Sequence, residues 1–96
     1  KGASNTDKRL GDIMLGCYVM GDYQQCLEYS KKIGTMNPVA WAAKIASLSA
    51  LKNLDEKEIE KKKFSDSYEN VSLDEKIEKL HFKDASIKQT MKELIV

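Results

Sequence analysis

The chain has 96 residues, of which 42% are hydrophobic and 7% aromatic, and its 16 Lys and Arg are nearly balanced by 15 Asp and Glu. This length allows one domain with a small core and excludes a deep active-site cavity. The near-neutral charge gives no reason to expect nucleic acid or an anionic membrane as the partner.

Apolar residues at helical spacing predict two helices at the start of the chain. The first spans about residues 6–20, and Gly21 ends it. Asp22 begins the second helix, with Gln25 three residues later in the arrangement of a capping box. Gly34 suits the left-handed position after the end of this second helix.

Asn37 and Pro38 mark the clearest boundary in the chain. Asn is a good N-cap, and Pro at the first helical position lacks an N–H that would have no partner there. The helix that follows, over about residues 38–54, has apolar residues around much of its circumference. We therefore expect it near the centre of the core.

The second half of the chain predicts three further helices. Asp55 caps one that continues to about residue 68, Ser72 caps a short one, and the last covers about residues 84–95. The apolar anchors of the first of these are Ile59, Phe64 and Tyr68. No segment alternates as a strand would, so the sequence predicts an all-α fold, and short connections predict antiparallel neighbours.

The segment Gly21-Asp22-Tyr23-Gln24-Gln25-Cys26-Leu27, followed by Asn37-Pro38, resembles the second half of a tetratricopeptide repeat. That family's unit is a helix–turn–helix of about 34 residues. With Pro38 as the terminal proline of the repeat, Gly21 takes the place of the turn glycine. Cys26 takes the place of the small residue where the paired helices approach.

The resemblance implies antiparallel hairpins stacked as a short tetratricopeptide-like solenoid within a single domain. One repeat covers residues 7–40, and a degenerate second covers about 41–74. Helices over about 75–96 would cap the stack. The pattern departs from the family where Met14 replaces a glycine and where Asp55 replaces the second turn glycine.

By this resemblance the chain is a non-catalytic protein–protein interaction module, or a small helical chaperone or adaptor. It would bind a helix or extended segment of another protein in an apolar groove. In this register the partner-binding residues are Lys8, Leu15, Tyr18, Val19, Ile45, Ser49 and Lys52. Leu15 and Tyr18 lie off the core stripe of their helix, so they need cover from a partner or from the chain's own last helix.

Two other interpretations remain open. The chain could be the structural end of a longer helical solenoid or a subunit of a larger assembly, and an uncovered apolar face would favour a homodimer. Its size and outline are also similar to the tetratricopeptide-like chaperones of type III secretion, although no motif here is specific to them.

No motif for catalysis, metal or cofactor is present, so we expect no enzyme activity. His81, the only histidine, has no Cys or His at metal-ligand spacing. The basic triplet Lys61-Lys62-Lys63 lies among acidic residues, which argues against nucleic acid. The longest run without a charged side chain, residues 33–43, is shorter than the roughly 20 residues that cross a bilayer.

The two cysteines, Cys17 and Cys26, are too few for a disulfide framework. Both fall in apolar helical patterns, where a free thiol behaves as a small hydrophobe. Free thiols favour a reducing compartment, so the sequence predicts a cytoplasmic protein.

Overall fold

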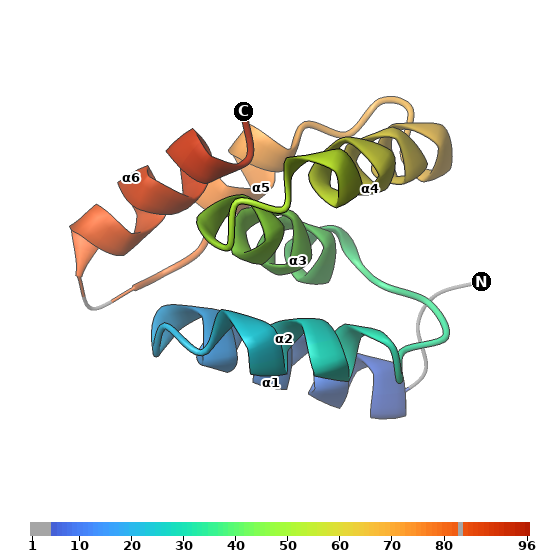
Figure 1. The fold of residues 1–96 in the computed structure, drawn as a ribbon, viewed down its shortest axis with the longest axis horizontal. Coiled ribbons are helices and arrows are strands. Elements are labelled where there is room, and N and C mark those ends of the chain that lie inside the picture. The colour runs from blue at the N-terminus through green and yellow to red at the C-terminus, as the bar shows by residue number, and fades with distance from the viewer. Residues whose placement is uncertain (1–4, 83) are drawn as a thin grey trace.

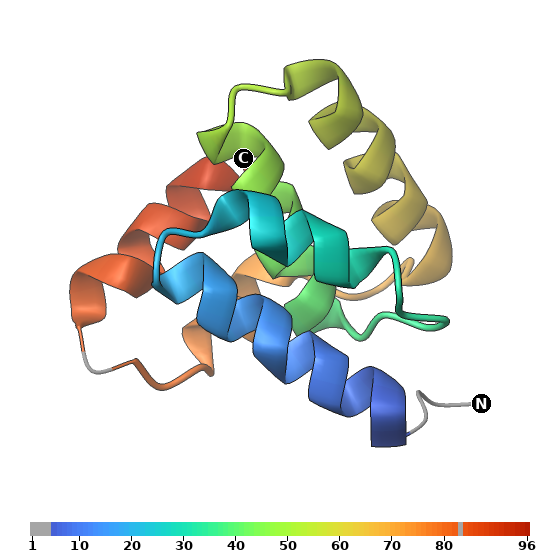
Figure 2. The ribbon, with the colours of Figure 1, turned by 60° about the horizontal axis from the view of Figure 1, so that its bottom comes forward.

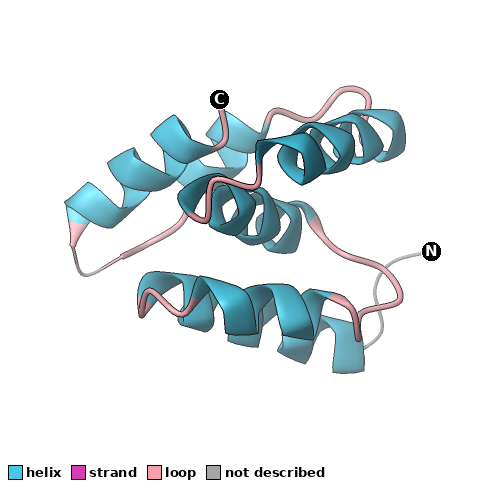
Figure 3. Cartoon of the chain, viewed as in Figure 1, coloured by secondary structure: helices cyan, strands magenta, loops and turns pink. Residues whose placement is uncertain are grey.

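The computed structural model describes residues 5–82 and 84–96, which form six α-helices joined by loops (Figures 1 and 3). The helices are α1 (Asn5–Val19), α2 (Tyr23–Ser30), α3 (Pro38–Ala50), α4 (Leu54–Ser67), α5 (Leu73–Glu78) and α6 (Ala85–Leu94). No strand occurs in the described residues, and the predicted all-α class is confirmed.

Helix α3 is the centre of the fold, as its apolar circumference predicts. It packs against each of the other five helices, whereas α4 makes its main contacts with α3 alone. Figure 2 shows α2 returning along α1, with α3 behind both and α6 on the far side of α3 from α4. Four alanines, Ala40, Ala42, Ala43 and Ala46, are buried along α3, and small side chains allow several helices to approach it closely.

N-cap residues in the sequence predict where most of the helices begin. A side-chain oxygen of Asn37 accepts a hydrogen bond from the Ala40 N–H at 2.9 Å, which begins α3. The predicted caps at Asp22 and Ser72 are confirmed in the same way by bonds from the N–H groups of Gln25 and Glu75. Asp84, where the last helix is predicted to begin, is the N-cap of α6 and accepts from the Ser86 N–H. The predicted cap at Asp55 is wrong, because α4 begins at Leu54 and Asn53 is the N-cap.

The predicted helix ends are less accurate. Helix α2 ends at Ser30, and Gly34 does not take the predicted left-handed conformation. Among the described residues, positive φ occurs at Gly21 (83°) and at Lys52 (62°). Lys52 ends α3 several residues earlier than predicted, since its left-handed backbone turns the chain.

The same hydrogen-bonded turn closes α1 and α3. After α1, the N–H of Asp22 donates to the Cys17 carbonyl at 2.9 Å. After α3, the N–H of Asn53 donates to the Leu48 carbonyl, also at 2.9 Å. Both are Schellman closures with the left-handed residue one place earlier. Lys52, and not Asp55, therefore holds the position in the second turn that Gly21 holds in the first.

Helix α4 turns charged residues toward the core. Lys57, Glu60 and Phe64 are its buried side chains, at helical spacing on one face. Ile59, predicted as an apolar anchor, is 50% exposed on another face, so that prediction is wrong. Phe64 and Tyr68 do pack inward as predicted, and their rings stack with centroids 5.3 Å apart.

Candidate functional site

The residues predicted to bind a partner do not form one open groove. Ile45 is completely buried, and Tyr18 is only 5% exposed. Both belong to the core cluster, so neither can contact a partner in this conformation. Of the others, Leu15 and Ser49 are partly buried, and Lys8, Val19 and Lys52 are exposed.

The faces of α3 explain the burial of Ile45. Ala40 lies against α1, while Trp41 and Lys44 contact α4. At about 3.6 residues per turn, Ile45 and Ser49 lie on the remaining side, where α5 and α6 pack. The Ser49 hydroxyl accepts a hydrogen bond from the Lys57 ammonium, which also donates to the Val96 carbonyl just after α6.

Helix α6 covers this face of α3 and reaches the α1–α2 turn. Its Met91 is completely buried, and Ile95, just after the helix, is 8% exposed. At the other end of α6, Ile87 and Thr90 line a crevice of about 120 Å³ together with Tyr18, Val19 and Tyr23. Of the two covers that the sequence left open for Tyr18, the chain's own last helix is the nearer to the structure: it lies across this crevice from Tyr18, whose ring is also 5.7 Å from that of Tyr23.

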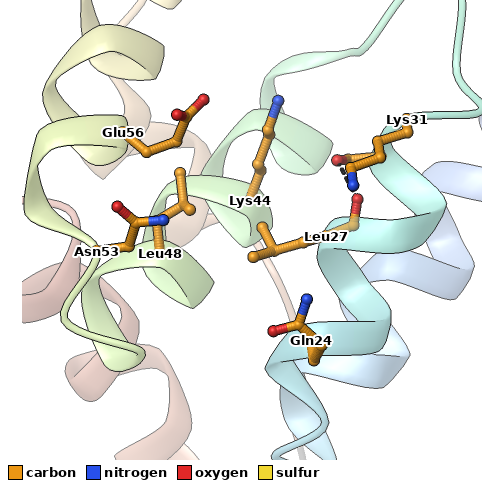
Figure 4. A pocket seen from close by; sticks show the side chains of 8 residues that line it. Gln24, Leu27, Lys31, Lys44, Leu48, Asn53 and Glu56 are labelled. Carbon is orange, nitrogen blue, oxygen red and sulfur yellow. Dashed lines mark hydrogen bonds between the residues drawn. The ribbon is translucent and has the colours of Figure 1, made fainter.

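An open cleft lies on a neighbouring face of α3, between α2 and α4. We call it the α2–α4 cleft, and it has a volume of about 310 Å³. Figure 4 shows α2 and α4 as its two walls, with Lys44 and Leu48 of α3 between them. Its lining residues are Gln24, Leu27, Ser30, Lys31, Lys44, Leu48, Asn53 and Glu56. The cleft exists because α4 packs on α3 without packing on α2.

The chemistry of the cleft is mixed. Leu27 and Leu48 provide apolar surface, while Gln24 and Asn53 provide amide donors and acceptors. Lys31 on one wall and Glu56 on the other bring charges of opposite sign. Such a lining suits a polypeptide segment, whose side chains alternate in chemistry, better than a uniformly charged polymer.

A buried ion pair forms the base of the α4 wall. The Lys44 ammonium lies 3.0 Å from a carboxylate oxygen of Glu60 and 5.9 Å from the centre of the Trp41 ring. The second carboxylate oxygen of Glu60 is 3.3 Å from the Lys63 ammonium. The sequence alone does not single out this ion pair, although the spacing of Lys57, Glu60 and Phe64 is a signal that these side chains share one face of α4.

A second hollow, of about 400 Å³, lies where the α2–α3 loop meets the end of α4. Met36, Trp41 and Tyr68 line it, together with Gly34, Thr35 and Ser67. The Tyr68 hydroxyl donates a hydrogen bond to the Met36 carbonyl at 2.9 Å, which joins the loop to α4. Trp41 also packs edge-on against Phe64, with ring centroids 6.2 Å apart. These contacts fix the angle of α4 on α3.

The two cysteines lie on facing helices as free thiols, Cys17 on α1 and Cys26 on α2. Burial raises the pKa of Cys26 to about 11, although the nearby Ser47 side chain and the Lys44 charge oppose the shift. Burial also raises the pKa of Cys17, and the nearby Asp22 carboxylate adds to the effect. Both thiols are therefore protonated and poorly nucleophilic near neutral pH.

Residues 5–82 and 84–96 show neither a metal centre nor a membrane span. No group of three His, Cys, Asp or Glu side chains there could hold a metal ion. No helix there is long and apolar enough to span a bilayer. Comparison of the chain with protein-family models, with curated proteins and with solved structures found no match.

Proposed function

We propose that the chain is a non-catalytic protein-interaction module that holds a short segment of another protein in the α2–α4 cleft. The observation that carries the proposal is the cleft itself, an opening with helices for both walls and α3 for its floor. Leu27 and Leu48 would bury an apolar side chain of the partner, and the charged residues at the rim would orient it.

Two structural features support a tetratricopeptide-like arrangement as part of this proposal. Helix α3 packs against both α1 and α2, as the first helix of a second repeat packs on the preceding pair. The pairs α1–α2 and α3–α4 are closed by the same turn, with Gly21 and Lys52 in equivalent positions. In this proposal α5 and α6 cap the stack.

The exposed apolar residues of α4 favour a second candidate function. Leu54 and Ile59 are 55% and 50% exposed. A neighbouring helix in a longer solenoid or a larger assembly would bury them at about 25 cal/mol per Å² of apolar surface. In that case the chain is a structural subunit, and the α4 surface, not the cleft, is its interface.

Selection of peptides on the intact chain tests the proposal. Peptides from a library of random helical sequences displayed on phage would be selected on the wild-type protein, and their affinities measured by fluorescence anisotropy. We expect Leu27→Asp to weaken binding about tenfold or more, because a carboxylate would replace apolar surface in the cleft. Ile59→Asp is the matched control, since it makes the same kind of change outside the cleft.

The two candidate functions give opposite results. Peptides that bind in the cleft lose affinity with Leu27→Asp and keep it with Ile59→Asp. The reverse pattern would favour the α4 surface as the interface. Failure to enrich any peptide on wild-type protein that is folded by circular dichroism would contradict the interaction-module proposal.

A further inference from the structure

The charged residues of the α2–α4 cleft gather toward one of its ends. Figure 4 shows Lys31, Lys44 and Glu56 at this end, with Leu27 and Leu48 nearer the middle. Lys31, at the end of α2, follows Leu27 by four positions, and on α3 Lys44 precedes Leu48 by four. Four positions correspond to about 6 Å along a helix axis. The apolar part of the cleft is therefore followed by a charged part roughly one helical turn further along.

Both lysines of this charged end already have a partner within the fold. The Lys44 ammonium lies 3.0 Å from a carboxylate oxygen of the buried Glu60. The Lys31 ammonium lies 3.6 Å from a carboxylate oxygen of Glu28, three positions earlier on α2. An acidic side chain that approaches either lysine therefore meets a carboxylate beside it, and like charges repel. The two lysines are poor anchors for an anionic partner.

Glu56 is a carboxylate at the same end that no cation of the described residues neutralises. It is exposed in the first turn of α4. None of the ion pairs within residues 5–82 and 84–96 includes it. One turn further along α4, Glu60 is already held by Lys44 and Lys63. The charge that this end of the cleft leaves for a partner is therefore negative and lies on the α4 wall.

We propose that the segment held in the α2–α4 cleft carries a lysine or arginine side chain that pairs with Glu56, next to an apolar side chain that packs on Leu27 and Leu48. This inference rests on the proposed function and adds the charge of the partner to it. In a helical partner the two side chains are three or four positions apart, which matches the separation of the apolar and charged parts of the cleft. The apolar contact supplies affinity, and the ion pair selects among segments and fixes their direction.

The first turn of α4 offers a matched control. Asp55 and Glu56 are both exposed acidic residues there, and both interact favourably with the positive end of the helix dipole. Glu56 lines the cleft, whereas Asp55 does not. Asp55→Lys and Glu56→Lys therefore change the net charge of the protein and the charge at the start of α4 by the same amount. The two variants differ in the charge that the cleft presents.

Peptides selected on the wild-type protein give the first measurement. Those that lose affinity with Leu27→Asp bind in the cleft, and we expect most of them to carry Lys or Arg three or four positions from an apolar residue. Fluorescence anisotropy of one such synthetic peptide should show about fivefold weaker binding to Glu56→Lys and unchanged binding to Asp55→Lys. The loss should shrink in about 1 M NaCl, because salt screens an exposed ion pair.

A charge-swapped peptide completes the test. With its basic residue replaced by glutamate, the peptide should bind Glu56→Lys more tightly than it binds the wild type, because the exchanged charges attract again. Cleft-binding peptides without an excess of basic residues, or equal affinities for Glu56→Lys and Asp55→Lys, would overturn this inference and leave the proposed function standing. If no selected peptide depends on Leu27, the proposed function itself fails, and this inference fails with it.

Discussion

The ammonium of Lys44 on α3 lies 3.0 Å from a carboxylate oxygen of Glu60 on α4, and the Glu60 side chain is only 2% exposed. Lys44 retains 19% exposure and borders the α2–α4 cleft. The two partners are therefore unequal: removal of the lysine leaves a carboxylate that water barely reaches. Removal of the carboxylate leaves an ammonium that can turn toward the cleft and its solvent.

The difference in exposure between Lys44 and Glu60 predicts how much each substitution of this ion pair destabilises the fold. Lys44→Met should lower the free energy of unfolding by about 3 kcal/mol, because it leaves a buried charge with only Lys63 beside it. Glu60→Met should cost less, about 1 kcal/mol, because Lys44 can be solvated and keeps its place near Trp41. Urea denaturation followed by circular dichroism measures both.

The double variant Lys44→Met with Glu60→Met is the control for that prediction. It should recover most of the loss, because replacing a buried ion pair by apolar side chains is often close to neutral. Strictly additive losses would show that the two side chains do not interact energetically, whatever their distance.

Gly16 and Gly21 both have room for a Cβ atom, so substitutions there show the effect of backbone conformation on stability without a steric clash. A Cβ added at Gly16 or at Gly21 would meet no atom within 4 Å, but Gly21 has a φ of +83°. Gly16→Ala should raise the free energy of unfolding by about 0.5–1 kcal/mol, since Gly16 lies inside α1. Gly21→Ala should lower it by about 1 kcal/mol, because an L side chain disfavours that φ. Equal effects of the two changes would rule out this explanation.

The two asparagines before α3 and α4 form another matched pair. Asn37 caps α3 through its side chain, whereas the side chain of Asn53 makes no cap hydrogen bond. Asn37→Ala should therefore cost about 1 kcal/mol and Asn53→Ala only a few tenths. Thermal unfolding of the two variants decides this, and a comparable loss for Asn53→Ala would contradict the cap assignment.

Local signals explain how much of the fold the sequence predicts. The caps at Asp22, Asn37 and Ser72 each depend on a bond to a residue three positions away, so the sequence carries the whole interaction. The turn at Lys52 has no such signal, because lysine is not a residue that favours positive φ. The repeat register therefore predicts the second turn at Asp55, which is wrong, since the left-handed residue is Lys52.

The candidate site depends on long-range contacts that no local pattern specifies. Tyr18 and Ile45 look available in the sequence. Only the folded chain shows that both belong to the core, Ile45 on the helix against which α5 and α6 pack and Tyr18 beside the Tyr23 ring. The α2–α4 cleft depends on the angle of α4 against α3, which Trp41, Phe64 and the buried Lys44–Glu60 pair determine. Charged residues at core positions follow the same spacing as apolar ones, but a hydrophobicity pattern does not count them.

Alkaline pH should destabilise the protein because the buried Cys26 thiol and Tyr18 phenol lose their protons. Burial raises the pKa of Cys26 to about 11 from its ordinary 9.0. Burial, with Tyr23 and Cys26 nearby, raises the pKa of Tyr18 to about 12 from 10.0. The unfolded chain releases these protons at lower pH than the folded one. Their contribution to stability is therefore complete below about pH 9 and falls as the pH rises toward the folded-state values.

Cys26→Ala isolates the contribution of the thiol. At pH 7–8 the variant should be less stable than wild type by about 1 kcal/mol, because it leaves a small cavity in the core. As the pH rises above about 9 the difference should narrow, since only wild type then loses the stability that the protonated thiol provides. Urea midpoints measured from pH 7 to 10.5 under reducing conditions test this. A difference that stays constant over the whole range would show that the Cys26 thiol titrates alike in the folded and unfolded chains, contrary to its complete burial.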